Sequence, residues 1–152
     1  MIVIAKKVNE IVACELADNS KEFAMLAVAK CIEESNRQVI KIIETIVCDR
    51  NAASNVNAPI SQELQLKLLK YCKKNYMLPV VIHSHVCYNH LRFSPIDTQL
   101  EKAMLEVSEH IGGEKKLLSI LICHQEYLAR LWHEDKETYI PIENWGGRNL
   151  YA

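Results

Sequence analysis

The fold prediction starts from the segment Leu78-Pro79-Val80-Val81-Ile82-His83-Ser84-His85 and from Ser94-Pro95-Ile96-Asp97, which follows it. Its first five residues are apolar, rich in β-branched side chains and start beside a proline, which predicts a buried strand over about 78–82. Side chains alternate along a strand, so we expect His83 and His85 to share one face. Two imidazoles held side by side at a strand end form half of a zinc site.

An amphipathic helix is predicted soon after this strand. Ser94 is a favourable N-cap, Pro95 is favoured at the first helical position, and Asp97 then lies in the first turn. The helix is expected to end at Gly112-Gly113. Its apolar face is predicted to contain Ile96, Leu100, Ala103, Met104, Val107 and Ile111.

The strand and the helix together predict a metal site. A carboxylate from the first turn of the helix, Asp97, can reach back to the two histidines at the strand end. His83, His85 and Asp97 would then be three protein ligands of one Zn²⁺ per chain, with a water in the fourth position. An open fourth position distinguishes catalytic zinc from structural zinc.

The same residues resemble a known signature. His83-x-His85, eight intervening residues and Ser94-x-x-Asp97 are similar to the motif of the JAMM metallopeptidases, the zinc-binding branch of the MPN (JAB/Mov34) domains. The resemblance implies that His83, His85 and Asp97 bind zinc and that Ser94 helps to hold the tetrahedral intermediate. It also implies a glutamate near the start of the domain that hydrogen-bonds the catalytic water, and Glu22 matches this position best.

Glu22 is chosen because it directly precedes a long apolar run that begins at Phe23. Glu10, Glu15 and Glu44 are alternatives for the same role. Whichever residue serves, the resemblance implies metal-assisted amide hydrolysis, in which the glutamate takes a proton from the attacking water and passes it to the leaving amine.

The resemblance also implies a class of substrate. JAMM domains commonly cleave the isopeptide bond after the C-terminal glycine of ubiquitin or a ubiquitin-like protein, and others process the tails of sulfur-carrier proteins. Such tails are extended, so an exposed sheet edge near the zinc could bind one as an added strand. The loop over 49–59, rich in Asn, Ala and Ser, is a segment that could order over a substrate, although an inert surface loop is an equal alternative.

Three alternatives compete with the peptidase prediction. Cys87 lies two residues after His85 and could close the metal site as a fourth ligand, which would make the zinc structural. A Cys87–His90 nucleophile is a weaker alternative, because nothing in the sequence supplies an oxyanion hole. A catalytically silent MPN scaffold would typically lack one or more of the four motif residues, and all four are present here.

Composition excludes several other classes of function. The 152 residues carry a net charge of −1, which gives no electrostatic basis for binding nucleic acid or anionic membranes. The six cysteines are widely spaced without a C-x-x-C pair, and the chain has no apolar run long enough for a membrane span. We therefore expect reduced thiols and a cytoplasmic location.

The remaining pattern predicts the frame around the motif. Strands are expected at about 2–5, 23–32, 38–48, 117–123, 127–133 and 138–142, a helix is expected from Val8, and another follows an N-cap at Ser61. The predicted fold class is α/β: a single MPN-like domain over 1–152, with a mixed central β-sheet flanked by helices in a cytidine-deaminase-like layering.

Overall fold

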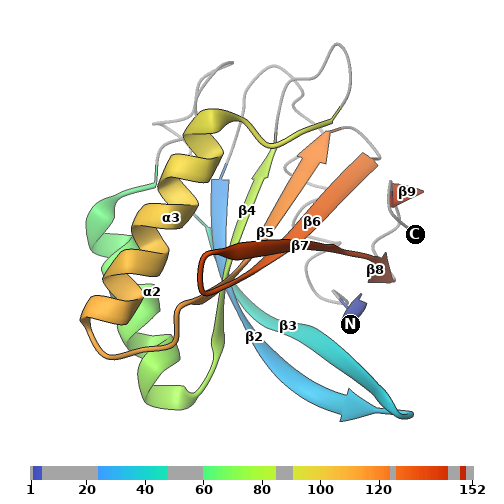
Figure 1. Cartoon of the computed structure of the whole chain (residues 1–152), viewed down its shortest axis with the longest axis horizontal. Coiled ribbons are helices and arrows are strands. Elements are labelled where there is room, and N and C mark those ends of the chain that lie inside the picture. Colours follow the sequence, from blue (N-terminus) through green and yellow to red (C-terminus); the bar gives the residue numbers. More distant parts are fainter. Residues whose placement is uncertain are drawn as a thin grey trace.

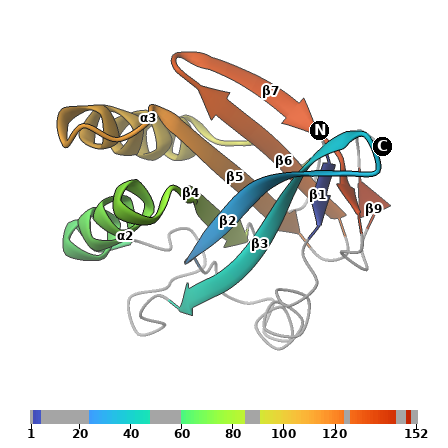
Figure 2. The same cartoon turned by 90° about the horizontal axis from the view of Figure 1, so that it is seen from below.

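The computed structural model describes residues 2–4, 24–47, 60–84, 91–123, 126–143 and 148–149. The expected helix from Val8 and the loop over 49–59 lie outside these residues. Within the described part, the chain forms a twisted mixed sheet with two helices on one of its faces (Figures 1 and 2). The predicted α/β class and the mixed sheet are confirmed.

Nine described strands join in one sheet, in the order β7-β6-β5-β4-β2-β3-β1-β8, with β9 paired to β6. β4 and β5 are parallel neighbours, whereas β2 pairs antiparallel with both β3 and β4. The strands are β1 Ile2–Ile4, β2 Ala24–Glu34, β3 Arg37–Val47, β4 Leu78–Ser84, β5 Lys116–Cys123, β6 Glu126–His133, β7 Lys136–Ile140, β8 Ile142–Glu143 and β9 Arg148–Asn149.

The strand predictions are close to these bounds, with two informative differences. β4 extends to Ser84, so that His83 lies inside the ladder instead of after it. The strand expected over 138–142 is divided at Pro141 into β7 and β8. Proline has no backbone N–H to donate to a ladder, which explains the division.

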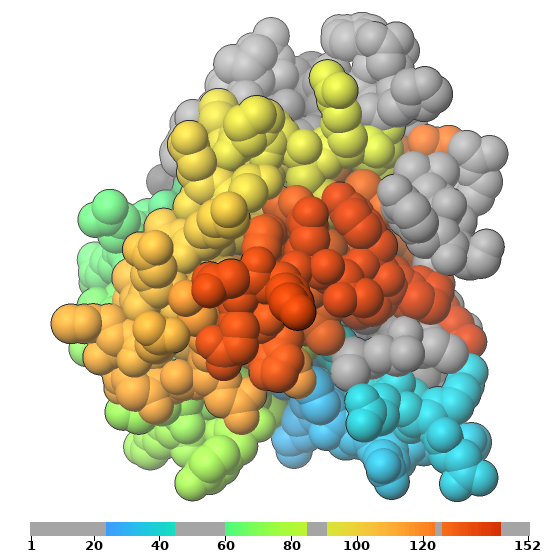
Figure 3. Space-filling model, in the orientation of Figure 1, coloured from blue at the N-terminus to red at the C-terminus, as the bar shows by residue number. Residues whose placement is uncertain are grey.

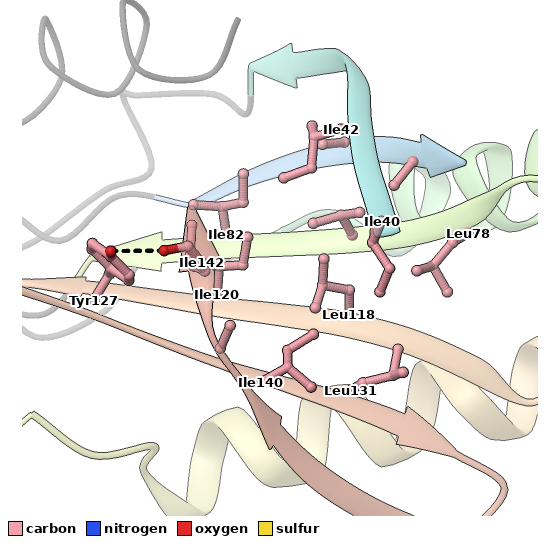
Figure 4. Close-up of a cluster of buried hydrophobic side chains, with 14 of the residues drawn as sticks. Ile40, Ile42, Leu78, Ile82, Leu118, Ile120, Tyr127, Leu131, Ile140 and Ile142 are labelled. Atoms are coloured by element: carbon pink, nitrogen blue, oxygen red, sulfur yellow. Dashed lines mark hydrogen bonds between the residues drawn. The ribbon is translucent and has the colours of Figure 1, made fainter. Parts of the chain in front are cut away.

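The helices α2, Gln62–Asn75, and α3, Pro95–His110, cover the same face of the sheet. A buried apolar cluster fills the space between them and the strands, and it includes Leu26, Val81 and Leu117 from the sheet. A second cluster lies on the other face, where the sheet curls on itself (Figure 4). There the hydroxyl of Tyr127 donates to the carbonyl oxygen of Ile142 at 3.0 Å.

The helix ends form where local sequence predicts them. The hydroxyl of Ser61 accepts from the backbone N–H of Leu64, and Ser94 caps α3 in the same way. Gly112 takes a left-handed backbone conformation, with φ 83°, just after α3. This conformation is easily reached by glycine and ends a helix.

The predicted apolar face of α3 is wrong in part. Ile96 is 70% exposed and Val107 is 39% exposed, although Met104 is buried as expected. The buried residues of the helix are Asp97, Glu101, Met104, Leu105 and Ser108. Two carboxylates lie on the inward face, and each meets a buried partner there: Asp97 meets His83 and Glu101 meets Arg130.

No helix in the described part of the chain has both the length and the apolar content that a membrane crossing needs.

Candidate metal centre

His83 lies near the end of β4, on the face of the sheet that the helices cover. Its strand neighbours are Ala24 of β2 and Leu121 of β5. Val81, two residues earlier, belongs to the helix-side cluster, whereas Ile82 belongs to the cluster on the other face. The alternation predicted for this strand therefore directs the His83 imidazole toward α3. The residue is buried, with 5% of its surface exposed.

Asp97 meets His83 from the first turn of α3. The distance between Asp97 Oδ1 and His83 Nδ1 is 3.7 Å, and both side chains are buried. The other carboxylate oxygen, Oδ2, accepts a hydrogen bond from the backbone N–H of Ser94 at 2.7 Å. The helix cap thus fixes the carboxylate and leaves Oδ1 directed at the imidazole. The predicted proximity of His83 and Asp97 is confirmed.

Ser94 completes a reciprocal capping box with Asp97. Its hydroxyl oxygen accepts from the backbone N–H of Asp97 at 3.1 Å. A serine hydroxyl has two lone pairs and one hydrogen, so accepting this bond does not use its capacity as a donor. The N-cap role and a donor role for Ser94 are therefore chemically compatible.

The other expected site residues, Glu22 and His85, lie outside the described residues, as do Cys87 and His90. Ala24, which follows Glu22 by two residues in the sequence, pairs directly with His83. In the ranges that the structure describes, no group of three or more His, Cys, Asp or Glu side chains is arranged to hold a metal ion. His83 and Asp97 are the described share of the predicted ligand set.

Glu44, an alternative to Glu22, is poorly placed for chemistry at His83. It is exposed on β3 and pairs with Val28 of β2, which in turn pairs with Pro79 of β4. Pro79 precedes His83 by four residues, or roughly 13 Å along a strand. Glu44 therefore lies well away from the level of the candidate site.

A buried ion pair that the sequence analysis missed lies beside these residues. Arg130 of β6 and Glu101 of α3 are 3% and 0% exposed. Arg130 Nε donates to Glu101 Oε1 at 2.9 Å and Nη2 donates to Oε2 at 2.7 Å. Burial alone would lower the pKa of Arg130, but its hydrogen bonds with Glu101 and the charges of Glu101 and Glu137 raise it above the ordinary value.

One sequence signal could have revealed this pair. Glu101 follows Asp97 by four residues, so the two carboxylates share one face of the helix. Arg130 interrupts the otherwise apolar strand segment 127–132. A charged residue at a position that patterning assigns to the core usually has a buried partner.

A pocket of about 320 Å³ lies elsewhere in the molecule and contains none of the motif residues. It is lined by the C-terminal ends of α2 and α3, including Cys72, Tyr76 and Gly112. Because α3 begins at the candidate site and ends at this pocket, the two features are at opposite ends of the helix.

The donor atoms that converge near the start of α3 suit zinc. Neutral imidazole nitrogen and carboxylate oxygen are common zinc ligands. His83 and Asp97 supply one of each, on two rigid elements, and the carboxylate is oriented by the Ser94 backbone as ligating carboxylates usually are.

Comparisons with known proteins support the fold alone. No protein-family model matches this chain, and no curated protein matches it. The structure is similar to the solution structure of protein DSY2949 from Desulfitobacterium hafniense, with a TM-score of 0.56 and 18% sequence identity. The alignment covers 93% of this chain and 91% of that one, so the likeness extends over nearly the whole architecture.

Proposed function

We propose that this protein is a zinc-dependent peptidase of the JAMM type, built on an MPN-like domain. It would hydrolyse the amide bond after the C-terminal glycine of ubiquitin, a ubiquitin-like protein or a sulfur-carrier protein. The observation that carries the proposal is the approach of Asp97 Oδ1 to His83 Nδ1, at 3.7 Å, with Ser94 adjoining in the same cap. These are three of the residues in the motif that the sequence resembles.

His83, His85 and Asp97 would hold the metal in this proposal. Zinc, when bound, supplies Lewis-acid chemistry: it polarises a carbonyl and lowers the pKa of water from about 15.7 toward roughly 7. Asp97 contributes a negative charge and a fixed direction, because its second oxygen is held by the Ser94 N–H. His83 contributes a nitrogen from a rigid strand, buried away from bulk solvent.

Ser94 would stabilise the charge that develops on the substrate oxygen. Its hydroxyl accepts from the Asp97 backbone N–H and retains its hydrogen for donation. A single donor of this kind typically contributes about 2.7–4 kcal/mol to transition-state stabilisation. The capping bond orients the hydroxyl oxygen before the substrate arrives, which reduces reorganisation during the reaction.

Glu22 would act as the general base and then as the general acid. Its carboxylate would take a proton from the attacking water and pass it to the leaving amine of the substrate lysine. The pairing of Ala24 with His83 supports this role, because Ala24 follows Glu22 by only two residues in the sequence.

β7 offers an edge for the extended tail of such a substrate. It stands at the end of the strand order and its side chains are mostly exposed. The centroid of its Tyr139 ring is 6.3 Å from the centroid of the Phe93 ring, and the Phe93 centroid is 6.5 Å from that of the His83 ring. A tail paired with this edge would lie beside Tyr139, whose ring contacts Phe93, the neighbour of His83.

The first test is the zinc content of the purified protein beside that of His85→Ala, with cleavage of a lysine-linked ubiquitin fusion measured on the same samples. His110→Ala is the matched control, because His110 is exposed at the other end of α3. We expect one zinc per chain in wild type and the control, and loss of both zinc and cleavage in His85→Ala.

Other outcomes would contradict parts of the proposal. Wild type without zinc would reject the peptidase and favour a scaffold role. Zinc that is lost in Cys87→Ser as well as in His85→Ala would indicate a closed structural site. Zinc without cleavage of ubiquitin fusions, together with cleavage of a sulfur-carrier fusion, would reassign the substrate within the same chemistry.

A further inference from the structure

The buried pair of Arg130 and Glu101 joins α3 to β6 about one helical turn after Asp97, the candidate metal ligand. Two parallel N–H···O bonds, at 2.9 and 2.7 Å, join the guanidinium of Arg130 to the carboxylate of Glu101. A bidentate pair of this kind fixes relative orientation as well as distance. Trp132 Nε1 also donates to Glu101 Oε1 at 3.1 Å, so three donors converge on one carboxylate.

Arg130 also contacts the residues on either side of the capping box. Its Nη2 atom donates to the hydroxyl of Thr98, at 3.0 Å, and Thr98 directly follows Asp97. Its guanidinium carbon lies 3.8 Å from the ring centroid of Phe93, which directly precedes Ser94. One side chain thus contacts the chain before Ser94 and after Asp97, and the Phe93 ring itself faces His83 edge-on.

These contacts connect α3 to the sheet close to the candidate metal centre, because Arg130 pairs with Ser119 of β5, which pairs with Val81, two residues before His83. Arg130 belongs to β6 and Glu101 to the second turn of α3, whose surface adjoins the β6–β7 hairpin (Figure 3). Glu101 lies about 6 Å along the helix from Asp97, since four residues rise about 1.5 Å each. A tilt or slide of the helix would therefore displace Asp97 directly.

A buried ion pair is weak evidence for a role in stability. Removing two charges from water is costly, and an apolar pair of similar volume often stabilises a fold as well or better. Ligand position, in contrast, is demanding, because metal–ligand distances vary by only about 0.2 Å. A residue that orients a ligand typically changes metal affinity or activity about 10- to 100-fold when it is substituted.

We infer that Arg130 is a positioning residue for the metal centre: through Glu101, Thr98 and Phe93 it holds the start of α3 so that Asp97 stays beside His83. The inference rests on the proposed function. It assigns Arg130 no contact with metal or substrate, and it predicts an effect on metal affinity that is separate from any effect on folding.

The test compares three variants with wild type. Arg130→Met combined with Glu101→Gln removes both charges, keeps an acceptor for Trp132 and avoids an unpaired buried ion. Arg130→Lys keeps the charge but loses the bidentate fork and the planar contact with Phe93. Glu137→Gln is the control. It weakens the third interaction of Arg130, in which Nη1 donates to the half-exposed Glu137 carboxylate on β7 at 2.7 Å, and it changes no residue of α3.

The readouts are the Zn²⁺ dissociation constant from chelator competition, the visible spectrum of the Co²⁺-substituted protein and thermal unfolding. We expect the double variant to fold, to bind Zn²⁺ about 10- to 100-fold more weakly and to show an altered Co²⁺ spectrum. Arg130→Lys should shift in the same direction by a smaller amount, and Glu137→Gln should match wild type.

Two failures can be told apart. Wild type that binds no metal would overturn the proposed function and this inference with it. Wild type that binds zinc, beside a folded double variant or a folded Arg130→Lys with unchanged zinc affinity and Co²⁺ spectrum, would overturn the positioning role alone.

Discussion

Ser94 and Asp97 hydrogen-bond each other in both directions, and this exchange directs Oδ1 of the Asp97 carboxylate toward His83. The backbone N–H of Ser94 donates to Asp97 Oδ2, and the backbone N–H of Asp97 donates to the Ser94 hydroxyl. The same two residues thus begin α3 and shape the candidate site. Substitutions that keep one role and remove the other are therefore informative.

Asp97→Asn should separate the helix cap from metal binding. The amide oxygen of asparagine can still accept from the Ser94 N–H, so we expect the free energy of unfolding to stay within about 1 kcal/mol of wild type. The anionic ligand is lost, and cleavage should fall by about 100-fold or more, beyond the range typical of supporting residues. Denaturant titration and zinc analysis of the same sample check this; wild-type zinc affinity in Asp97→Asn would rule out the ligand role.

Ser94→Gly should separate the hydroxyl from the cap. Glycine at an N-cap costs only a few tenths of a kcal/mol relative to serine, whereas alanine costs about 1 kcal/mol. Both variants lack the donor, so kcat should fall about 10²- to 10³-fold in each. Ser94→Thr keeps the hydroxyl and serves as the control. Steady-state kinetics that show full turnover in Ser94→Gly would leave serine with the capping role only.

Glu22→Gln should abolish proton transfer and leave metal binding intact. General acid–base catalysis contributes about 10²- to 10⁴-fold, so cleavage should fall by that factor at unchanged zinc content. Glu44→Gln is the control, because Glu44 is exposed on β3 at the level of Pro79. A reversed result, with activity lost in Glu44→Gln and kept in Glu22→Gln, would reassign the base.

Cys72 should make the fold sensitive to alkaline pH. Burial raises the pKa of its thiol from 9.0 to about 12. Between these values the unfolded chain loses the thiol proton and the folded chain keeps it, so the free energy of unfolding falls as pH rises. In Cys72→Ala the fall between pH 9 and 11 should be smaller than in wild type.

Denaturant titrations across this pH range measure how steeply the free energy of unfolding falls with pH in each protein. The cavity left by alanine lowers this free energy by a constant amount and does not change its dependence on pH. Peptide mapping after brief alkylation gives an independent check: Cys31, which is exposed, should be labelled in the native protein, and Cys72 should be labelled only after unfolding. Equal labelling of both thiols, or equal slopes, would contradict the prediction.

Local sequence accounts for most of the described fold. Ser94 and Gly112 mark the ends of α3 because capping depends on neighbouring residues. Alternation along β4 places His83 on the same face as Val81, the face that the helices cover, since side-chain direction in a strand follows from position alone. The approach of Asp97 to His83 follows from these two local predictions and the short connection between their elements.

Long-range pairing accounts for what the sequence did not reveal. Glu101 and Arg130 are 29 residues apart and come from different elements, so no periodic pattern links them. Glu101 is buried on α3 through this pairing, whereas Ile96, which hydrophobicity assigns to the core, is exposed. The roles of Glu22 and His85 stay predictions, because both residues lie outside the described part of the chain.

The turn of the β2–β3 hairpin is a suitable position for attaching a label to this protein. The turn residues, Ser35 and Asn36, have positive φ values of 52° and 61°, and most side chains of the outer half of the hairpin are exposed. The hairpin extends away from the helices (Figure 1). The turn lies eleven residues along β2 from Ala24, the partner of His83, or roughly 36 Å at strand rise. A fluorophore or surface-immobilisation tag attached at this turn would allow substrate binding to be measured without blocking the candidate site.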